Sequence, residues 1–191
     1  MNTRPLPVPT VTLIEQECRE FDDENQLVEE ALRLLLLRFP YNTERAHVLL
    51  KVLTLNELYS TRVRDIDVQP LARHIAEHGI DSLITQGSFE AVDLIVKCPN
   101  MKSYLSFASK FCSWHNPMDY PIWDGNVRAC LWAYKQQDEF ATFHNYDLWD
   151  YESFRSIMSA FQARYGLELL SSKEVDKFLW RLGDRILRQE G

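Results

Sequence analysis

The chain has 191 residues, of which 46% are apolar and 12% aromatic, which is enough to form a folded core and excludes a disordered protein. Its six glycines are too few for a turn-rich β-fold, and no glycine-rich phosphate-binding motif occurs. The formal net charge of −7 counts against a generally basic nucleic-acid binder, although a local basic face is compatible with it.

The cysteines and the apolar segments predict a cytoplasmic protein. None of the four cysteines belongs to a C-x-x-C pair or a zinc-ribbon spacing; they are Cys18, Cys98, Cys112 and Cys130. The leucine run 34–37 is far too short to cross a bilayer, and residues 1–9 lack the apolar core of a signal peptide. We therefore expect no metal, no other cofactor and no membrane partner. The sequence indicates no oligomeric state.

Helical periodicity dominates from about residue 23 onward, after an extended, proline-punctuated arm over residues 1–20. Asp81, Ser88 and Asn100 are candidate caps of the helices that follow them. The helices expected in the first part of the chain cover 22–39, 43–59, a third with Pro70 near its start that ends at Gly79, two short ones over 81–98, and 101–114.

Three further helices are expected after a proline-rich loop at 115–121. They begin near Asp124, at Tyr151 and at Lys173, and end near 137, 165 and 188. Ser171 and Glu174 form a capping-box pair before the last helix. No strand, internal repeat or linker is apparent, so the sequence predicts a single, compact, all-α domain over residues 1–191.

One short segment carries the chemistry: Tyr120-Pro-Ile-Trp-Asp-Gly-Asn-Val-Arg-Ala-Cys-Leu. It resembles the aspartate segment of the helix-hairpin-helix DNA glycosylases and is closest to their adenine-mismatch branch, which has Pro-Ile-x-Asp-Gly-Asn-Val-Lys/Arg. The resemblance is specific over about ten residues and agrees with the helix order over about ninety. It implies the helix-hairpin-helix glycosylase fold and a DNA-repair enzyme that removes a damaged or modified base from duplex DNA.

Asp124 is the catalytic carboxylate that this resemblance implies. Breaking an N-glycosidic bond builds positive charge on the sugar, and a nearby carboxylate stabilises that charge. A carboxylate at a helix N-terminus stays ionised because free N–H groups and the helix dipole favour it. The alternative interpretation is that Asp124 only caps a helix.

A glycosylase that also has AP-lyase activity needs a lysine amine as nucleophile. Lys110, flanked by aromatic residues in Phe107-Ala-Ser-Lys-Phe111, is the preferred candidate, and Lys102, at the expected start of the same helix, is the second. Both precede Asp124, as the resemblance requires.

Several residues around Asp124 are candidates for substrate binding. Trp114, Trp123, Phe107 and Phe111 are expected to stack on a flipped base, although aromatic residues at helical spacing are more often core residues. Asn126 and Arg128 are expected to contact DNA.

Two departures from the glycosylase pattern bear on these expectations. The family's hairpin Leu-Pro-Gly-Val-Gly is absent, and residues 97–102 read Lys-Cys-Pro-Asn-Met-Lys in its place. The iron–sulfur cysteines of the adenine-mismatch branch are also missing, which favours the cluster-free 8-oxoguanine-type branch. A catalytically inactive relative, a helical module that binds protein or nucleic acid, therefore stays open as the alternative.

Two other groups of residues suggest a chemistry different from that of a glycosylase. His74-Ile-Ala-Glu77-His78 matches the H-x-x-E-H pattern of zinc peptidases, but it is short and equally typical of an exposed helix end. Cys112 and His115 are close enough in sequence for thiol chemistry, whereas a cysteine in an apolar helix usually packs as a small hydrophobic residue.

Overall fold

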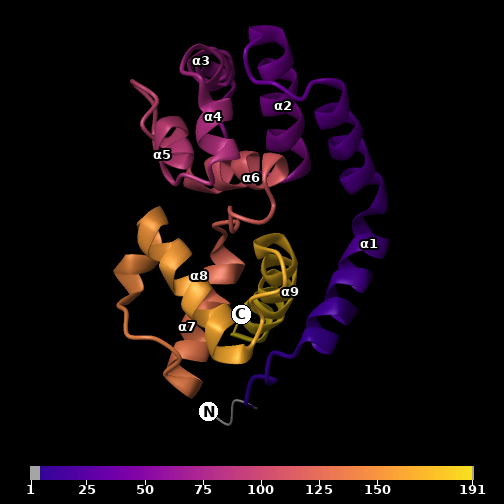
Figure 1. The fold of residues 1–191 in the computed structure, drawn as a ribbon, viewed down its shortest axis with the longest axis vertical. Coiled ribbons are helices and arrows are strands. Elements are labelled where there is room, and N and C mark those ends of the chain that lie inside the picture. Colours follow the sequence, from indigo (N-terminus) through magenta and orange to yellow (C-terminus); the bar gives the residue numbers. More distant parts are fainter. Residues whose placement is uncertain (1–4, 191) are drawn as a thin grey trace. The chain divides into compact units, whose positions relative to one another are not determined.

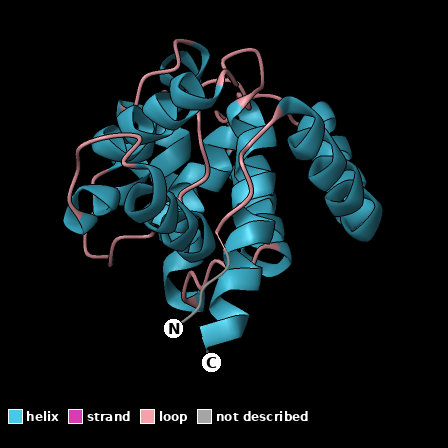
Figure 2. Cartoon of the chain, turned by 90° about the horizontal axis from the view of Figure 1, so that it is seen from below, coloured by secondary structure: helices cyan, strands magenta, loops and turns pink. Residues whose placement is uncertain are grey.

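All regular secondary structure of the described residues is helical, which confirms the all-α prediction. The computed structural model describes residues 5–190, and Figure 2 shows helices joined by loops over that range. The elements are labelled in Figure 1: α1 (Val11–Arg38), α2 (Arg45–Leu58), α3 (Asp65–Glu77), α4 (Ile80–Thr85), α5 (Glu90–Val96), α6 (Leu105–His115), α7 (Gly125–Asp138), the 3₁₀ helix η1 (Asn145–Trp149), α8 (Tyr151–Tyr165) and α9 (Ser172–Glu190). None of these helices has the length and hydrophobicity of a membrane span.

Contacts within the chain gather into two compact units. Unit 1 comprises the described residues up to Glu24 together with those from Pro121 onward, and unit 2 comprises residues 25–120. The first boundary lies inside α1 and the second lies directly before Pro121, so neither coincides with a flexible linker that the sequence would reveal. The expectation of a single domain stays a prediction.

The start of α1 corrects the expectation of an extended arm over residues 1–20. The helix begins at Val11, where the Thr10 Oγ1 accepts a hydrogen bond from the Leu13 N–H at 3.2 Å, as an N-cap does. Only residues 5–10 of the arm are non-helical, and residues 1–4 lie outside the described residues. The first turns of α1 are mostly polar, and Ile14 is one of the few apolar residues that they bury. Hydrophobic periodicity therefore did not predict this part of the helix.

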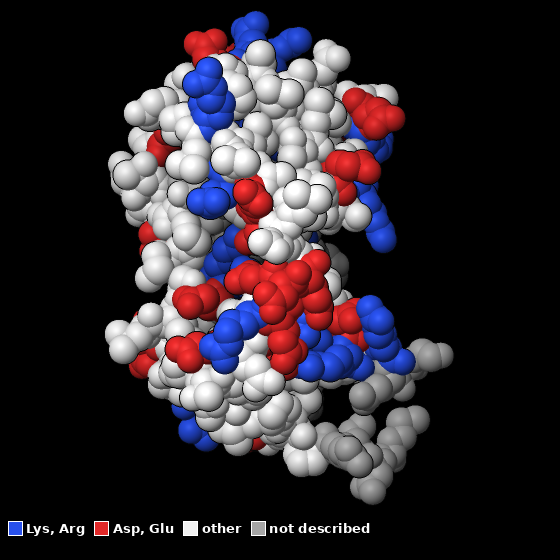
Figure 3. Space-filling view, turned by 90° about the vertical axis from the view of Figure 1, so that its right-hand side faces the viewer, with Lys and Arg blue, Asp and Glu red and all other residues white. Residues whose placement is uncertain are grey.

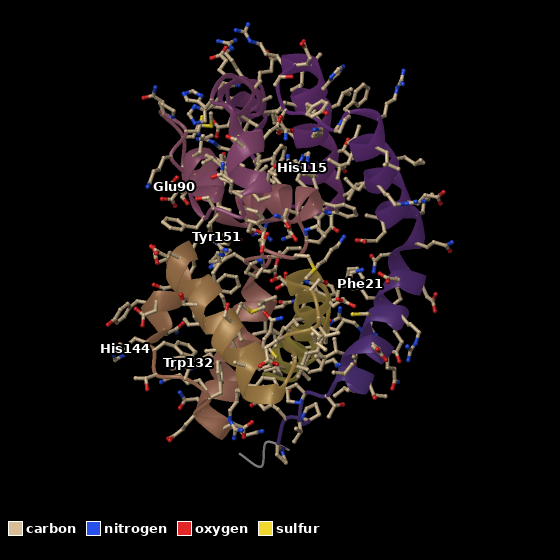
Figure 4. All side chains as sticks on the ribbon, viewed as in Figure 1. Phe21, Glu90, His115, Trp132, His144 and Tyr151 are labelled. Atoms are coloured by element: carbon tan, nitrogen blue, oxygen red, sulfur yellow. The ribbon has the colours of Figure 1, made fainter. Side chains whose placement is uncertain are left out.

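Unit 1 is built on the packing of α7 against α9, with the first half of α1 attached to α9. Phe21 packs edge-on against Trp180, with ring centroids 5.9 Å apart, and Figure 4 shows Phe21 on the side of α1 that faces α9. Acidic and basic side chains lie side by side on the face that α1 forms (Figure 3). Arg181 of α9 pairs with three carboxylates of α1, on Glu17, Glu20 and Glu24.

Unit 2 contains α2 to α6, and the turn between α5 and α6 differs from its prediction. Asn100 does not cap a helix; its φ of 61° is left-handed, and α6 begins only at Leu105. A residue in the left-handed region cannot supply the extended backbone of a helix N-cap, so the predicted start at Met101 is wrong. Lys102 therefore lies in the turn and not on the helix.

Three other helix boundaries agree with their sequence signals, whereas Asp81, predicted to cap a helix, lies inside α4, whose N-cap is Gly79. Gly79 has a φ of 62°, as predicted for the residue that ends the third helix. The Ser171 hydroxyl accepts the Glu174 N–H at 3.2 Å while the Glu174 carboxylate accepts the Ser171 N–H at 2.7 Å, which is the predicted capping box. Helix α8 spans Tyr151–Tyr165, the predicted range.

Candidate functional site

Asp124 is the N-cap of α7, as the sequence predicts. Its backbone is extended, with φ −144° and ψ 155°, and its Oδ1 accepts the N–H of Asn126 at 3.0 Å. Helix α7 has 14 residues, and the partial positive charge at its start lies beside the Asp124 side chain. The side chain is partly exposed. A negative charge is thus held at a defined place on the surface of unit 1.

The loop that leads to Asp124 is held by hydrogen bonds from three other elements of unit 1. Tyr151, in the first turn of α8 (Figure 4), donates its hydroxyl to the Pro121 carbonyl at 2.9 Å. Asp176 of α9 accepts the Ile122 N–H at 2.5 Å. The indole N–H of Trp123 donates to the Leu148 carbonyl of η1 at 2.6 Å. Each residue before Asp124 is therefore anchored separately, and the carboxylate follows a loop with little freedom to move.

The start of α7 is also fixed by its close approach to α9. A Cβ atom at Gly183 would lie 2.1 Å from the carbonyl oxygen of Asn126, which no real contact allows. Glycine is therefore required at position 183 so that the two backbones can meet. This contact fixes the turn of helix that Asp124 caps.

An arginine and two tryptophans form a stacked cluster one helical turn beyond Asp124. The Arg128 guanidinium carbon lies 3.8 Å from the centre of the Trp149 ring and 5.2 Å from that of Trp123. The two indole rings are 5.0 Å apart. Trp149 is 58% exposed, so the cluster reaches the surface. Guanidinium groups stack favourably on indole faces, which explains how Arg128 is held.

Burial affects both the hydrogen bonding and the pKa of Arg128. Its Nε is buried and has no hydrogen-bond partner among the described residues. Burial lowers the pKa of Arg128 from its ordinary value. We predicted that Arg128 contacts DNA; the structure shows its guanidinium stacked on the two tryptophans.

The two candidate lysines belong to unit 2, whereas Asp124 belongs to unit 1. Lys110 is 5% exposed, its amine donates to the Ser106 hydroxyl at 2.9 Å, and it lies 5.8 Å from the centre of the Tyr59 ring. Lys102 is exposed, with its amine 5.1 Å from the centre of the Tyr104 ring. The pairing of either lysine with Asp124 stays a prediction.

The aromatic residues predicted to receive a base are divided between the two units. Phe107 and Phe111 are fully buried in unit 2, so neither offers an open ring face. Trp114 is partly exposed and donates its indole N–H to the Tyr59 hydroxyl at 3.2 Å. Of the four, only Trp123 lies next to Asp124 in unit 1.

The H-x-x-E-H segment shows no metal site. Glu77 pairs with Arg45 at 2.5 Å, the His74 Nε2 lies 2.9 Å from the Leu94 carbonyl, and the His78 Nδ1 lies 2.7 Å from the His74 carbonyl. Each of the three side chains is thus engaged by the protein itself. No group of three potential ligands suited to a metal occurs among residues 5–190.

Cys112 and His115 lack the electrostatics of a nucleophilic pair. Burial strongly raises the pKa of the Cys112 thiol, so the thiolate is disfavoured. Burial lowers the pKa of His115 to about 4, helped by the nearby charge of Lys51. Cys112 therefore packs as a small hydrophobic residue in α6.

Sequence reasoning missed the residues that hold the site together. Asp176 carried a usable signal, because it is a carboxylate at a buried position beside Val175 and Phe178 of α9. Tyr151 and Gly183 carried none, since a tyrosine at a helix start and a glycine inside a helix are each compatible with many roles.

The sequence is similar to one described family of proteins. Residues 13–119 match the family model described as HI_0787_N, N-terminal domain, a range that is more than half of the chain. The chain belongs to this family. An uncharacterized protein of Haemophilus influenzae is 33% identical over 135 residues, which make up 69% of this chain and 63% of that protein. The chain thus spans just under two thirds of the length of this relative. No solved structure matches the chain.

The family match includes both candidate lysines but ends before Pro121. Its end at residue 119 almost coincides with the end of unit 2 at Tyr120. The Asp124 segment therefore lies in the part of the chain that follows the family's N-terminal domain.

Proposed function

We propose that the chain is a DNA N-glycosylase that removes a damaged or modified base from duplex DNA, with Asp124 as its essential carboxylate. The observation that carries the proposal is the anchored loop 121–124, which presents a carboxylate at the start of a long helix. A water molecule adds to C1′ of the sugar, and the base leaves with the electron pair of the glycosidic bond. Asp124 stabilises the positive charge that develops on the sugar and accepts the proton of the attacking water.

The path of the chain through α5, the turn and α6 supports a helix-hairpin-helix type of fold. The turn lacks the family's glycines, but Asn100 adopts the left-handed conformation that a glycine would otherwise supply. In hairpins of this kind, backbone N–H groups bind DNA phosphates. Local phosphate contacts of this sort are compatible with a net charge of −7.

The stacked cluster of Trp123, Arg128 and Trp149 supplies the base-binding surface in this proposal. A base taken out of the duplex needs an aromatic face on which to stack. Trp149 of η1 has an exposed ring in the same unit as Asp124, and it stacks on Arg128, which lies one turn along α7 from Asp124. Arg128 on the cluster adds a positive charge close to the substrate phosphates.

A lysine extends the reaction to AP-lyase chemistry. The amine attacks C1′, and the base leaves with the electron pair of the glycosidic bond and takes up the proton that the amine loses. The sugar ring then opens at the C1′–O4′ bond to give the Schiff base, and β-elimination, with loss of a C2′ proton, expels the 3′ phosphate. Lys110 is buried, whereas exposed Lys102 reaches a substrate more readily. The cytoplasm is the compartment we assign, because none of the described cysteines forms a disulfide.

The test measures base release from duplexes that carry 8-oxoguanine, uracil, a modified cytosine or an adenine mismatch. We expect Asp124→Asn to lose at least a hundredfold in rate because the developing sugar charge is no longer stabilised. Asp150→Asn is the matched control: Asp150 caps α8 by accepting the Ser153 N–H at 2.9 Å and lies outside the motif. Equal rates for Asp124→Asn and the wild-type protein would overturn the role of Asp124.

Borohydride trapping on an abasic duplex tests the lyase step. A covalent adduct that is lost in Lys110→Gln but kept in Lys102→Gln identifies Lys110 as the nucleophile, and the opposite result identifies Lys102. If the folded protein releases no base and forms no adduct, the inactive binding module becomes the better assignment. The acidic net charge and the glycine-free hairpin favour that second function.

A further inference from the structure

The second half of α1 is apolar on two opposite faces. One face packs inward, with Leu32 only 1% exposed. The other face is open: Leu27 is 79% exposed, Leu34 54% and Leu37 67%. Ala31, also exposed, lies between them. A surface helix normally has a single apolar stripe and a polar opposite face, so α1 departs from the usual pattern.

The spacing of the open residues makes them one continuous stripe. At 3.6 residues per turn, positions 27, 31 and 34 lie nearly above one another, and 37 lies at the edge of the same face. The stripe is about 15 Å long, from 1.5 Å of rise per residue. Contiguous exposed apolar residues, unlike single exposed leucines, are typical of interaction surfaces.

We propose that this stripe, residues Leu27, Ala31, Leu34 and Leu37 of α1, binds the same stripe of a second copy of the chain in antiparallel orientation. A two-fold axis near positions 31 and 32 places Leu27 of one copy opposite Leu37 of its partner. The two copies then bury each other's open leucines. The inference is independent of the glycosylase proposal.

The charged residues beside the stripe favour a second copy in the antiparallel orientation. Glu30 and Arg33 lie on the same side of the stripe, next to Leu37; both are exposed, and neither forms an ion pair within the described part of the chain. The two-fold axis brings each Glu30 opposite Arg33 of its partner, which makes two intermolecular ion pairs. A parallel pair would instead place the charged side chains of the two copies on opposite sides of the interface, where Glu30 and Arg33 could not pair with each other.

The size of the stripe predicts a weak dimer. Stable dimers bury about 800 Å² on each partner, and one short stripe is smaller than that. We therefore expect an association that depends on concentration, with monomer at low micromolar and dimer at several hundred micromolar protein.

Sedimentation velocity across this concentration range tests the stripe. We expect the wild-type chain to shift from monomer to dimer and Leu34→Glu to stay monomeric, because a buried unpaired carboxylate opposes association. Leu169→Glu is the matched control, since Leu169 is 97% exposed in the loop between α8 and α9 and is remote from the stripe in sequence. A wild-type chain that stays monomeric throughout, or a dimer that Leu34→Glu leaves intact, would overturn the proposal.

A charge-reversal cycle tests the orientation. Glu30→Arg alone places like charges opposite each other and should weaken the dimer at least fivefold, as should Arg33→Glu alone. The double variant Glu30→Arg/Arg33→Glu restores the opposite-charge pairs and should regain the wild-type dissociation constant. A double variant as weak as the single ones would exclude antiparallel pairing. Circular dichroism confirms that each variant keeps its helices, which the exposure of both side chains predicts.

Discussion

The carbonyl oxygen of Asn126 lies so close to Gly183 that a Cβ atom on that glycine would be 2.1 Å from it. This contact joins α9 to the first turn of α7, directly after the residue that carries the proposed chemistry. The position of Asp124 thus depends on a glycine 59 positions later in the chain, and the structure of the site is set by tertiary packing as much as by the local motif.

We predict that Gly183→Ala destabilises the chain by about 1 to 3 kcal/mol, because the added methyl group forces α7 and α9 apart. Urea denaturation measures the change. Gly125→Ala is the matched control: a Cβ atom there meets nothing within 4 Å, and alanine favours the helix by about 0.5 to 1 kcal/mol. If both variants had the same free energy of unfolding, the close approach of the two helices would be refuted.

Tyr151→Phe should lower the free energy of unfolding by about 1 kcal/mol. The loss is larger if no water replaces the hydroxyl as hydrogen-bond donor to the Pro121 carbonyl. The variant removes one hydroxyl from a buried hydrogen bond and leaves the ring in place. Thermal unfolding followed by circular dichroism measures the effect. Tyr146→Phe, at a tyrosine that is 68% exposed, should be neutral. Equal melting temperatures for Tyr151→Phe and the wild-type protein would show that this hydrogen bond does not hold the loop.

The part of the site that is local in sequence could be predicted, and the part that is brought in from other helices could not. Asp124 follows a proline-containing loop and precedes helical spacing, so its capping role is readable from its neighbours. The partners of that loop, Asp176 and Tyr151, lie tens of residues further on, and no local spacing links them to it. Their roles follow only from the packing of α8 and α9.

The helices, like the residues of the site, include some that the sequence predicts and some that it does not. The range of α8 was predicted from its apolar spacing, because its buried residues recur every three or four positions. The first turns of α1 were missed, since they are held largely by charged groups: Glu17 is buried and bonded to Arg181 and Arg185. A pattern based on hydrophobicity does not register a helix whose inner face is partly ionic.

Arg181 is the main electrostatic link between α1 and α9, and Arg181→Met should cost about 2 kcal/mol or more. The loss leaves carboxylates facing one another, so the deficit should shrink as salt rises. Arg188→Met is the control, because Arg188 pairs with Asp184 at 2.8 Å while 78% exposed and should contribute less than about 0.5 kcal/mol. Urea denaturation at low and high salt distinguishes the two. A deficit that is independent of salt would show that Arg181 acts through packing alone.

Low pH should weaken the ion pairs between α1 and α9, because Glu17 becomes protonated. Burial raises the pKa of Glu17, but hydrogen bonds from Arg185 and Arg181 outweigh burial and hold that pKa below its ordinary value. A carboxylate with a lowered pKa stabilises the fold at neutral pH, and this contribution is lost as pH falls through its folded pKa. Glu17→Gln should therefore flatten the acid limb of the stability profile. An unchanged acid limb would place the acid sensitivity elsewhere.

Lys51 is a fully buried lysine in unit 2. Its amine donates to the Asn42 Oδ1 at 2.8 Å and to the Tyr41 carbonyl at 3.1 Å, and Asp81 holds Asn42 from the other side. Burial lowers the pKa of Lys51 to about 8, and the nearby Asp81 offsets only part of that effect. The folded chain therefore binds this proton less tightly than the unfolded chain does.

Stability should consequently rise with pH. Below about pH 8 the amine is charged in both states and its burial cost is fully present; above that value the folded amine is neutral while the unfolded amine stays charged up to its ordinary pKa of 10.5. From about pH 7.5 to about pH 9.5 the free energy of unfolding should increase by about 1 to 2 kcal/mol relative to Lys51→Met, which has no proton to lose. Urea denaturation of both proteins across this range measures the difference and cancels the titration of other groups. Parallel profiles would mean that Lys51 stays charged in the fold, held by Asn42 and Tyr41, and that its burial carries no penalty that pH can relieve.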